Sequence, residues 1–397
     1  MSKAKKLIIN NKTKIFILAP ANTFTGGPEC LHQLAFHLKK VFKAKTYMVY
    51  LPTEVEKPVH KNFLKYKTNY SKFVEDNNNN ILILPEQFCY LKYALRYKKI
   101  NKVIWWLSVD NFFGFKFRED NSKFLRSLIK IPYNFISLFN RITKFYFGIL
   151  TYHDYLKYIY NFTKYHKQKE VDQAHLHLMQ SQYAFDYFKD KFKNIKKLYD
   201  YQSDMVLKKC KEKVKKKNEI CYSHKSNKFI NEIKKVLKFK FIALKNMSAN
   251  QVINIFKKTK IYLDFGYHPG KDKMPREAVL FNNCVITNLK GSAKNIHDIP
   301  IPKKFKFNEN NENIKKISKL IELIFKNYKK EIKLYKRYQK KTLLERQNFK
   351  KQLSEIFINV IFCPSKLPSP MVMLSPTFVG DTGIISALTV ISLSLLP

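Results

Sequence analysis

Short apolar runs alternate with helix-forming stretches along most of the chain. In the first half, the runs at 14–20, 46–51, 81–84, 103–106 and 176–179 predict buried strands. A helix is expected over 29–40, and Ser181 is placed to cap another. Strands separated by helices predict an α/β fold with a parallel sheet covered on both faces.

The second half of the chain restarts this pattern. Strands are expected at 219–222, 241–244, 261–265 and 284–287. Helices are expected at 229–237, at 249–258 behind a Ser248 cap, and at 275–281. We interpret a lysine-rich stretch over 200–215 as the linker between the two halves. This interpretation predicts one domain at 1–205 and a second at 206–345. Two such sheets facing each other would leave a cleft at the carboxyl ends of their strands, where ligands of open α/β sheets bind.

Three segments depart from the alternation. Residues 111–170 interleave aromatics with Lys and Arg, and form either extra core helices or a basic amphipathic surface at a bilayer interface. Residues 314–357 repeat apolar positions every three or four residues, which predicts C-terminal amphipathic helices. After Phe362 the composition changes abruptly, so we group 346–397 as a helix end and an atypical tail. The hypothesis for that tail is a non-native extension, such as a frameshifted translation.

The formal net charge of +45 is made mostly of lysine, since only seven of the 75 Lys and Arg residues are Arg. Asn, Ile, Phe and Tyr are abundant too, which favours AT-rich coding over selection for one ligand. The charge would still attract anionic headgroups, by about 1 kcal/mol per well-placed Lys. A basic nucleic-acid-binding protein is a weaker alternative, because such readers rely on Arg.

The expected location is the cytoplasm, peripheral to the inner membrane. The six cysteines form no CxxC pair, so neither a zinc site nor a disulfide framework is expected. The apolar run after residue 14 is too short for a secretory signal. No stretch reaches the roughly 20 apolar residues of a spanning helix.

Two loops carry candidate binding residues. Gly26 and Gly27 precede the first helix, where a backbone can approach a ligand and free N–H groups can meet a phosphate. Glu29 in that first turn is either a helix-dipole partner or a site carboxylate. After the first strand of the second half, Lys225 could meet a diphosphate across the cleft, although a solvated lysine is an equal alternative.

The most informative loop spans 264–278. It contains Gly270 and gathers Lys271, Lys273 and Arg276 at a helix amino-terminus, a suitable counter-charge for a diphosphate. Glu277 could accept both hydroxyls of a ribose. His268 is a candidate phosphate or sugar contact, as the one histidine in a Gly/Pro loop of this half. A solvated charged loop is the alternative.

The sequence resembles GT-B glycosyltransferases of bacterial capsule and lipopolysaccharide clusters. The resemblance lies at 26–38, 104–113, 179–188, 261–287 and 291–302, and covers about 14–330. It implies two Rossmann-like domains facing across a cleft, the second binding a nucleotide-sugar donor and the first an acceptor. Such enzymes carry two glutamates eight positions apart. Glu277 matches the second, ribose-binding one, whereas Pro269 stands at the first.

The resemblance implies that an acceptor hydroxyl attacks the donor's anomeric carbon while a nucleoside diphosphate leaves. No Asp-x-Asp occurs in the chain, so no metal and no permanently bound cofactor are expected, and fixed cations must stabilise the leaving group. Candidate bases at strand ends are Glu29, Asp110 and Glu86. Expected partners are the donor, a glycan or lipid-linked acceptor and an anionic membrane surface, without nucleic acid. A catalytically impaired GT-B-like scaffold is the main alternative.

Overall fold

The computed structural model describes residues 6–120, 123–143, 152, 155–156 and 169–360. The tail after residue 360 lies outside the described residues, and so does most of 144–168 within the basic aromatic segment. The hypothesis of a non-native tail therefore stays a prediction.

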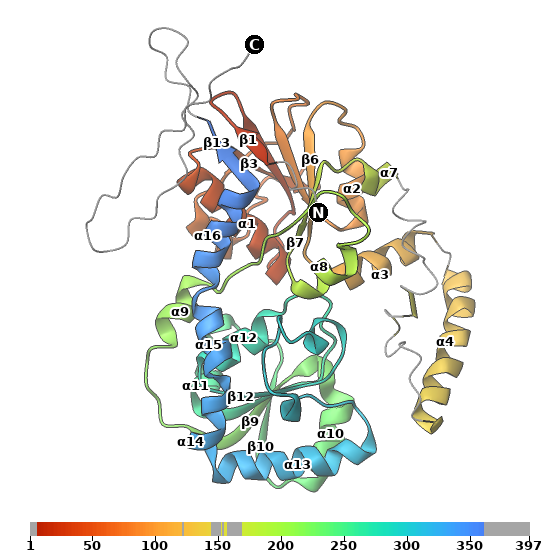
Figure 1. The fold of residues 1–397 in the computed structure, drawn as a ribbon, viewed down its shortest axis with the longest axis vertical. Helices are drawn as coiled ribbons and strands as arrows, with labels where there is room; N and C mark the ends of the chain where they lie inside the picture. The colour runs from red at the N-terminus through yellow and green to blue at the C-terminus, as the bar shows by residue number, and fades with distance from the viewer. Residues whose placement is uncertain (1–5, 121–122, 144–151, 153–154, 157–168, 361–397) are drawn as a thin grey trace, which may run out of the picture.

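The first domain is built on a seven-stranded, fully parallel sheet in the order β4-β3-β2-β5-β6-β7-β8 (Figure 1). Its strands are β2 (Lys14–Pro20), β3 (Lys45–Leu51), β4 (Asn69–Tyr70), β5 (Ile81–Pro85), β6 (Asn101–Trp106), β7 (Leu176–Met179) and β8 (Ile195–Lys197). The helices are α1 (Gly26–Val41), α2 (Phe88–Ala94), α3 (Val109–Asp120), α7 (Lys169–Asp172) and α8 (Gln182–Phe188), with a 3-10 turn η1 (Lys61–Tyr66).

Both faces of this sheet are buried, which explains why its strands read as continuous apolar runs. In β2, Ile15 and Ile17 join the core under α1, while Phe16 and Leu18 join the core on the opposite face. The alternation follows from successive side chains pointing to opposite faces of a strand. Ser181 caps α8 by accepting from the Ala184 N–H at 3.0 Å, so that predicted cap is confirmed.

The second domain has a four-stranded parallel sheet in the order β10-β9-β11-β12. Its elements are α9 (Asp204–Lys209), β9 (Lys217–Ser223), η2 (His224–Ser226), α10 (Asn227–Val236), β10 (Lys240–Leu244), α11 (Ala249–Lys258), β11 (Thr259–Asp264), α12 (Lys273–Leu280), β12 (Cys284–Thr287), η3 (Gly291–Lys294) and η4 (Lys303–Phe305). Ser248 and Gln251 form a reciprocal capping box at α11. The predicted α/β class, with two parallel sheets, is confirmed.

The C-terminal helices return the chain from the second domain to the first (Figure 1). They are α13 (Asn311–Lys326), α14 (Tyr328–Glu331), the 3-10 turn η5 (Ile332–Tyr335), α15 (Lys336–Leu343) and α16 (Glu345–Ile356). Tyr338 packs in the core of the second domain, whereas Phe349 and Leu353 pack against α1 in the first. The chain then forms β13 (Phe357–Asn359), which pairs in parallel with β1 (Leu7–Ile9).

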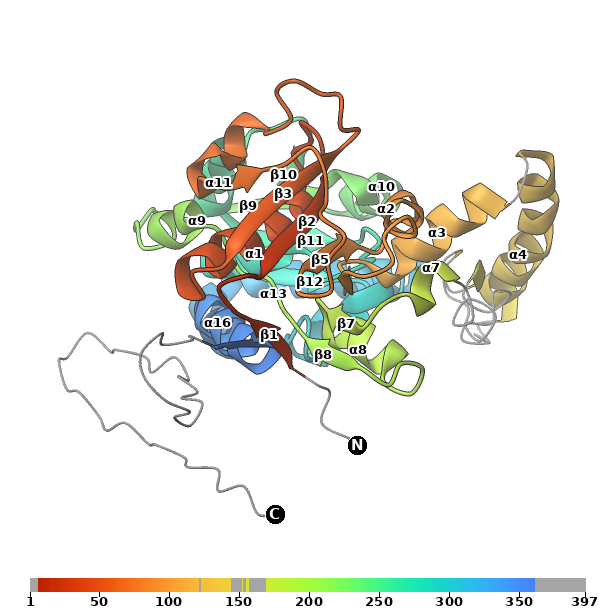
Figure 2. The same ribbon diagram turned by 90° about the horizontal axis from the view of Figure 1, so that it is seen from above.

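The basic aromatic segment begins inside the core and then leaves it. Phe112 and Phe113 of α3 are fully buried. The next helix, α4 (Lys123–Thr143), stands away from both domains in the two views (Figures 1 and 2). Among the side chains of α4 that the structure describes, the exposed large apolar ones are Leu128, Ile131, Phe135, Leu138 and Phe139. In the described part of the chain, no helix is both long enough and apolar enough to cross a membrane.

Candidate functional site

A cavity of about 460 Å³ lies where three strands of the second sheet end. Its walls come from the turns after β9, β10 and β11 and from the start of α12. The lining residues are Ser223, His224, Lys225, Leu244, Asn246, Met247, Val252, Asp264, Tyr267, Asp272, Lys273 and Met274. The position agrees with the rule that open α/β sheets bind ligands beyond their strand carboxyl ends, and the volume suits a small molecule.

Two lysines bring positive charge to this cavity. Lys225 lies exposed in η2, directly after β9, and Lys273 begins α12. The amino-terminus of α12 adds backbone N–H groups and the positive end of the helix dipole. An anion in the cavity would therefore meet two lysines and a helix end, beside the carboxylates of Asp264 and Asp272, which also line the cavity.

Lys273 also ties the two domains together. Its Nζ lies 2.7 Å from Glu29 Oε2 in the first turn of α1. Burial alone would raise the pKa of Glu29, but Lys273, Lys65 and the Tyr66 hydroxyl lower it overall. The predicted carboxylate and the predicted lysine are therefore direct partners, and both stay charged near neutral pH.

Glu277 lies one turn further along α12 and is partly exposed. Burial, together with the nearby Glu29 carboxylate, raises its pKa to about 7 despite the opposing effect of Lys273. Among the described residues, none makes a hydrogen bond or ion pair with its side chain. A carboxylate in this position can accept hydrogen bonds from a ligand.

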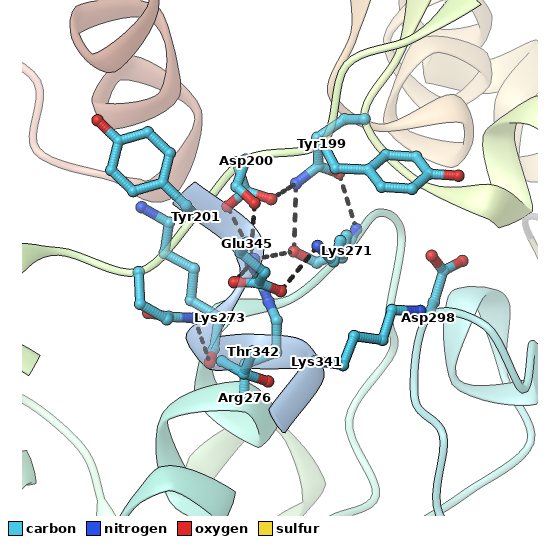
Figure 3. A network of polar contacts seen from close by, with 12 residues as sticks. Tyr199, Asp200, Tyr201, Lys271, Lys273, Arg276, Asp298, Lys341, Thr342 and Glu345 are labelled. Atoms are coloured by element: carbon cyan, nitrogen blue, oxygen red, sulfur yellow. Dashed lines mark hydrogen bonds and ion pairs between the residues drawn. The ribbon is translucent and has the colours of Figure 1, made fainter. Parts of the chain in front are cut away.

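Lys271 and Arg276 lie instead in a buried ionic network, although the sequence suggested a diphosphate cradle (Figure 3). Arg276 Nη2 lies 2.7 Å from Asp200 Oδ2, and Nη1 lies 2.9 Å from Glu345 Oε2. Lys271 Nζ lies 2.9 Å from Glu345 Oε1. Burial would raise the pKa of Asp200, but Arg276 and Lys271 lower it. Both cations are therefore neutralised by protein carboxylates.

His268 is fully buried beside the cavity rather than lining it. Its Nδ1 lies 2.9 Å from Asp272 Oδ2, and its Nε2 lies 3.6 Å from Asp264 Oδ1. Burial would lower its pKa, but these two carboxylates raise it to about 9. The single charge of the imidazolium thus offsets only part of the charge of these two aspartates, both of which line the cavity.

Glycine is required where the second domain touches the first. A Cβ on Gly270 would lie 2.3 Å from the Leu107 carbonyl oxygen, a contact only glycine permits. By contrast, a Cβ on Gly26 would meet nothing within 4 Å, and one on Gly27 would make an ordinary 3.6 Å contact with Leu107. Gly270 therefore serves domain packing, while Gly26 borders open space.

The other two candidate bases support the loop that Gly270 meets. Buried Glu86 accepts from the Leu107 N–H at 3.0 Å, and burial raises its pKa to about 7. Asp110, also buried, accepts from the Tyr183 hydroxyl at 2.9 Å and from the Tyr267 hydroxyl at 2.5 Å. The second of these bonds joins Asp110 to the turn after β11, again across the two domains.

The structure thus brings Glu29, Lys273 and Glu277 to one boundary between the domains, and it places Lys225 on the cavity that Lys273 also lines. Sequence reasoning missed Asp200 and Glu345, the carboxylates that engage Arg276. Neither lies near a recognisable motif, and both are buried on segments that cross between the domains. The one signal available in the sequence was an acidic residue at the point where the apolar pattern of one domain gives way to that of the other.

This arrangement is the GT-B fold: two Rossmann-like domains, a cavity at the strand ends of the second, and C-terminal helices that return to the first. A solved structure of HepE from Anabaena with UDP and glucose has a TM-score of 0.52 at 10% identity, over 86% of this chain and 98% of that one. The galactosyltransferase WaaB of the lipopolysaccharide outer core gives 0.53 at 11%, over 85% and 99%. Sucrose-phosphate synthase from Thermosynechococcus elongatus gives 0.52 at 9%, over 87% and 98%.

These likenesses concern the fold. No protein-family profile matches the sequence, and no curated protein does.

Proposed function

We propose that this protein is a glycosyltransferase that moves a sugar from a nucleotide-sugar donor to a surface-glycan precursor of the capsule or lipopolysaccharide type. The observation that carries the proposal is Glu277, a partly exposed carboxylate without a described partner, on the helix that opens from the 460 Å³ cavity. HepE, which shares the fold, was solved with UDP and glucose. In this proposal Glu277 accepts both ribose hydroxyls of the donor.

The donor's diphosphate would lie between Lys225 and the start of α12. Charge builds on these phosphates as the sugar leaves, and fixed cations stabilise that charge best when already in place. Lys273 is held by Glu29, so it needs no reorganisation when the donor binds. In this proposal His268, Lys271 and Arg276 do not contact the donor. They fix the loop that carries Lys273. The proposed reaction requires no metal.

The acceptor side would be the first domain, around Gly26, Gly27 and the 107–110 loop. Of the candidate bases, Glu86 has a pKa raised to about 7, the range that suits proton transfer at neutral pH. Glu29 is paired with Lys273, and Asp110 holds two tyrosine hydroxyls. We propose Glu86 as the base to test first, because within the described part of the chain it is the one candidate that is neither paired with a cation nor held by tyrosine hydroxyls, and Glu29 and Asp110 as residues that position the donor loop. Since Glu86 is buried and accepts from the Leu107 N–H, the 107–110 loop would have to move for an acceptor hydroxyl to reach it.

A membrane-bound acceptor is supported by α4. Its five exposed apolar side chains and its Lys and Arg residues suit an interfacial helix on anionic lipid. The proposed location is the cytoplasmic face of the inner membrane. Loss of sedimentation with phosphatidylglycerol vesicles in an F135S/L138S variant would support this placement.

The direct test has a binding arm and a transfer arm. Thermal-shift screening against UDP-, GDP- and CMP-sugars should find one donor that stabilises the protein, by about 2.7 kcal/mol at 100 times its Kd. Incubation of that radiolabelled donor with membrane extract should transfer label to lipid-linked or polymeric material. In E86Q, transfer should fall by about 100-fold or more while donor affinity is kept.

A second candidate is a non-catalytic scaffold with the same fold. It is favoured by Pro269, which stands where related enzymes carry a glutamate, and by the neutralised state of Lys271 and Arg276. Donor binding without any transfer would favour this scaffold. Absence of both donor binding and transfer would overturn the proposed enzyme.

A further inference from the structure

A second cavity, of about 980 Å³, lies at the opposite end of the second sheet. It is bordered by the segment before β9, the start of β11, the turn between α12 and β12, and the junction of α13 with α14. Because the strands are parallel, their amino ends meet here, on the far side of the domain from the proposed donor cavity. This cavity has no role in the proposed sugar transfer.

The walls of this basic cavity are strongly cationic. Eight of its seventeen lining residues are lysine, whereas Lys and Arg together make 75 of the 397 residues of the chain. The one acidic residue, Glu212, is already paired with Lys257 at 2.5 Å. The abundance of lysine in the whole sequence therefore does not account for this concentration.

The lysines at the rim carry no counter-charge from the protein. Five of them are exposed, and none makes an ion pair with any residue that the structure describes: Lys211, Lys213, Lys326, Lys329 and Lys330. Like charges around one hollow raise the local potential and attract anions, most strongly at low salt. An anionic ligand would relieve this repulsion.

The floor of the cavity is held by fixed contacts. Lys216 Nζ donates to the carbonyl oxygens of Phe256 and Thr259, at 2.8 and 2.6 Å. The Tyr328 hydroxyl donates to the Asn282 carbonyl at 2.6 Å, and the Lys260 ammonium lies 5.0 Å from the centre of the Tyr328 ring. The hollow thus persists without a ligand, while the rim side chains can turn toward one.

We propose that this cavity binds a ligand carrying several phosphate groups, separately from the nucleotide-sugar site. Lysine binds phosphate as a point charge, so several lysines around a hollow suit several phosphates rather than one planar carboxylate. The volume is at the upper end of small-molecule sites and exceeds the need of a single phosphate. The phosphates can belong to a free polyphosphorylated molecule or to anionic lipid headgroups.

The test uses the full chain and inorganic tripolyphosphate as the probe. Titration calorimetry should show binding that weakens with salt. In K326Q/K329Q/K330Q the Kd should rise about tenfold, from the loss of three exposed charge contacts. The matched control, K315Q/K316Q/K319Q, removes the same charge from the exposed face of α13, the helix that ends at Lys326, and should change the Kd less than about twofold.

A second arm replaces tripolyphosphate with phosphatidylglycerol vesicles and compares the same two variants in an F135S/L138S background, which removes the proposed contribution of α4 to vesicle binding. Selective loss of vesicle binding in the cavity variant, without tripolyphosphate binding, would assign the phosphates to a lipid surface. Equal weakening in both variants would show diffuse charge and overturn the site. Absence of binding to both probes, or binding unchanged in the cavity variant, would also overturn it, whatever the outcome for donor sugars.

Discussion

Lys273 Nζ lies 2.7 Å from Glu29 Oε2, and this ion pair joins the first turn of α12 to the first turn of α1. One residue of the pair comes from each domain. Glu277 stands one turn further along α12, where Lys273 and Glu29 both act on its carboxyl group. The charge state of Glu277 is therefore set at the boundary between the domains.

Replacing Glu277 should weaken donor binding. Hydrogen bonds to a charged group contribute about 1.5–3 kcal/mol, so E277A should raise the Kd of the nucleotide-sugar by about tenfold to a hundredfold. Calorimetric titration at pH 8 measures this change, and an unchanged melting temperature shows that the fold is kept. Unaltered affinity in E277A would remove the ribose contact from the proposed function.

The affinity should also depend on pH. The pKa of Glu277 is raised to about 7, and the ionised carboxylate is the form that accepts both hydroxyls. Donor affinity should therefore rise as the pH increases from 6 to 8. The E277Q variant cannot ionise at this position, so a comparable rise in E277Q would point to another group.

Breaking the network of Figure 3 should destabilise the protein strongly. The variant R276M leaves Asp200 and Glu345 buried without their shared partner. Removing one member of a buried ionic network costs about 3–5 kcal/mol, which thermal unfolding would detect. The control is R346Q, which removes an exposed pair with Asp204 and should cost at most about 1 kcal/mol. Similar losses in the two variants would contradict this account.

The sequence allowed good prediction of elements whose signals are local. The strands Leu176–Met179 and Cys284–Thr287 have the predicted bounds, because a parallel strand buried on both faces is a continuous apolar run. The Ser248 cap needs information from only four residues. The pairing of Leu7 with Phe357 was not predictable, because two three-residue strands far apart in the chain carry no local sign of each other.

The same distinction applies to the candidate site. The loop over 264–278 was recognised by its clustered charges. That Lys273 contacts Glu29 while Arg276 contacts Asp200 depends on how two domains meet, which is a long-range property of the fold. Charges in a loop predict an anion partner, and for Arg276 and Lys271 that partner is the protein's own carboxylates.

The stability of the protein should fall in mildly alkaline solution because of His268. Its pKa is about 9 in the folded protein, against 6.5 for an unperturbed histidine. A raised pKa stabilises fully below pH 6.5, and this contribution is lost as the pH rises through 9. The rise corresponds to at most about 3 kcal/mol. Unfolding free energies of the protein and of H268Q should therefore converge between pH 6.5 and 9, and parallel curves would contradict this role.

Adding one methyl group at Gly270 should disturb the contact between the domains. The Cβ of G270A would lie 2.3 Å from the Leu107 oxygen, so one backbone must move. Such overpacking costs about 1–3 kcal/mol, seen as a lower melting temperature. The stability control is G26A, whose Cβ meets nothing within 4 Å and should change stability by at most about 0.5 kcal/mol. Equal melting temperatures would show that the contact is loose in solution.

The chain passes from one domain to the other twice, and both passages run beside Arg276. The first lies between Tyr201 and Val206, next to Asp200, and the second between Tyr338 and Phe349, next to Glu345. Both covalent crossings are therefore held to the same guanidinium, one through Asp200 and the other through Glu345. A substitution at Arg276 would release both crossings at once, because among the residues that the structure describes these two carboxylates share no second partner as deeply buried as this guanidinium.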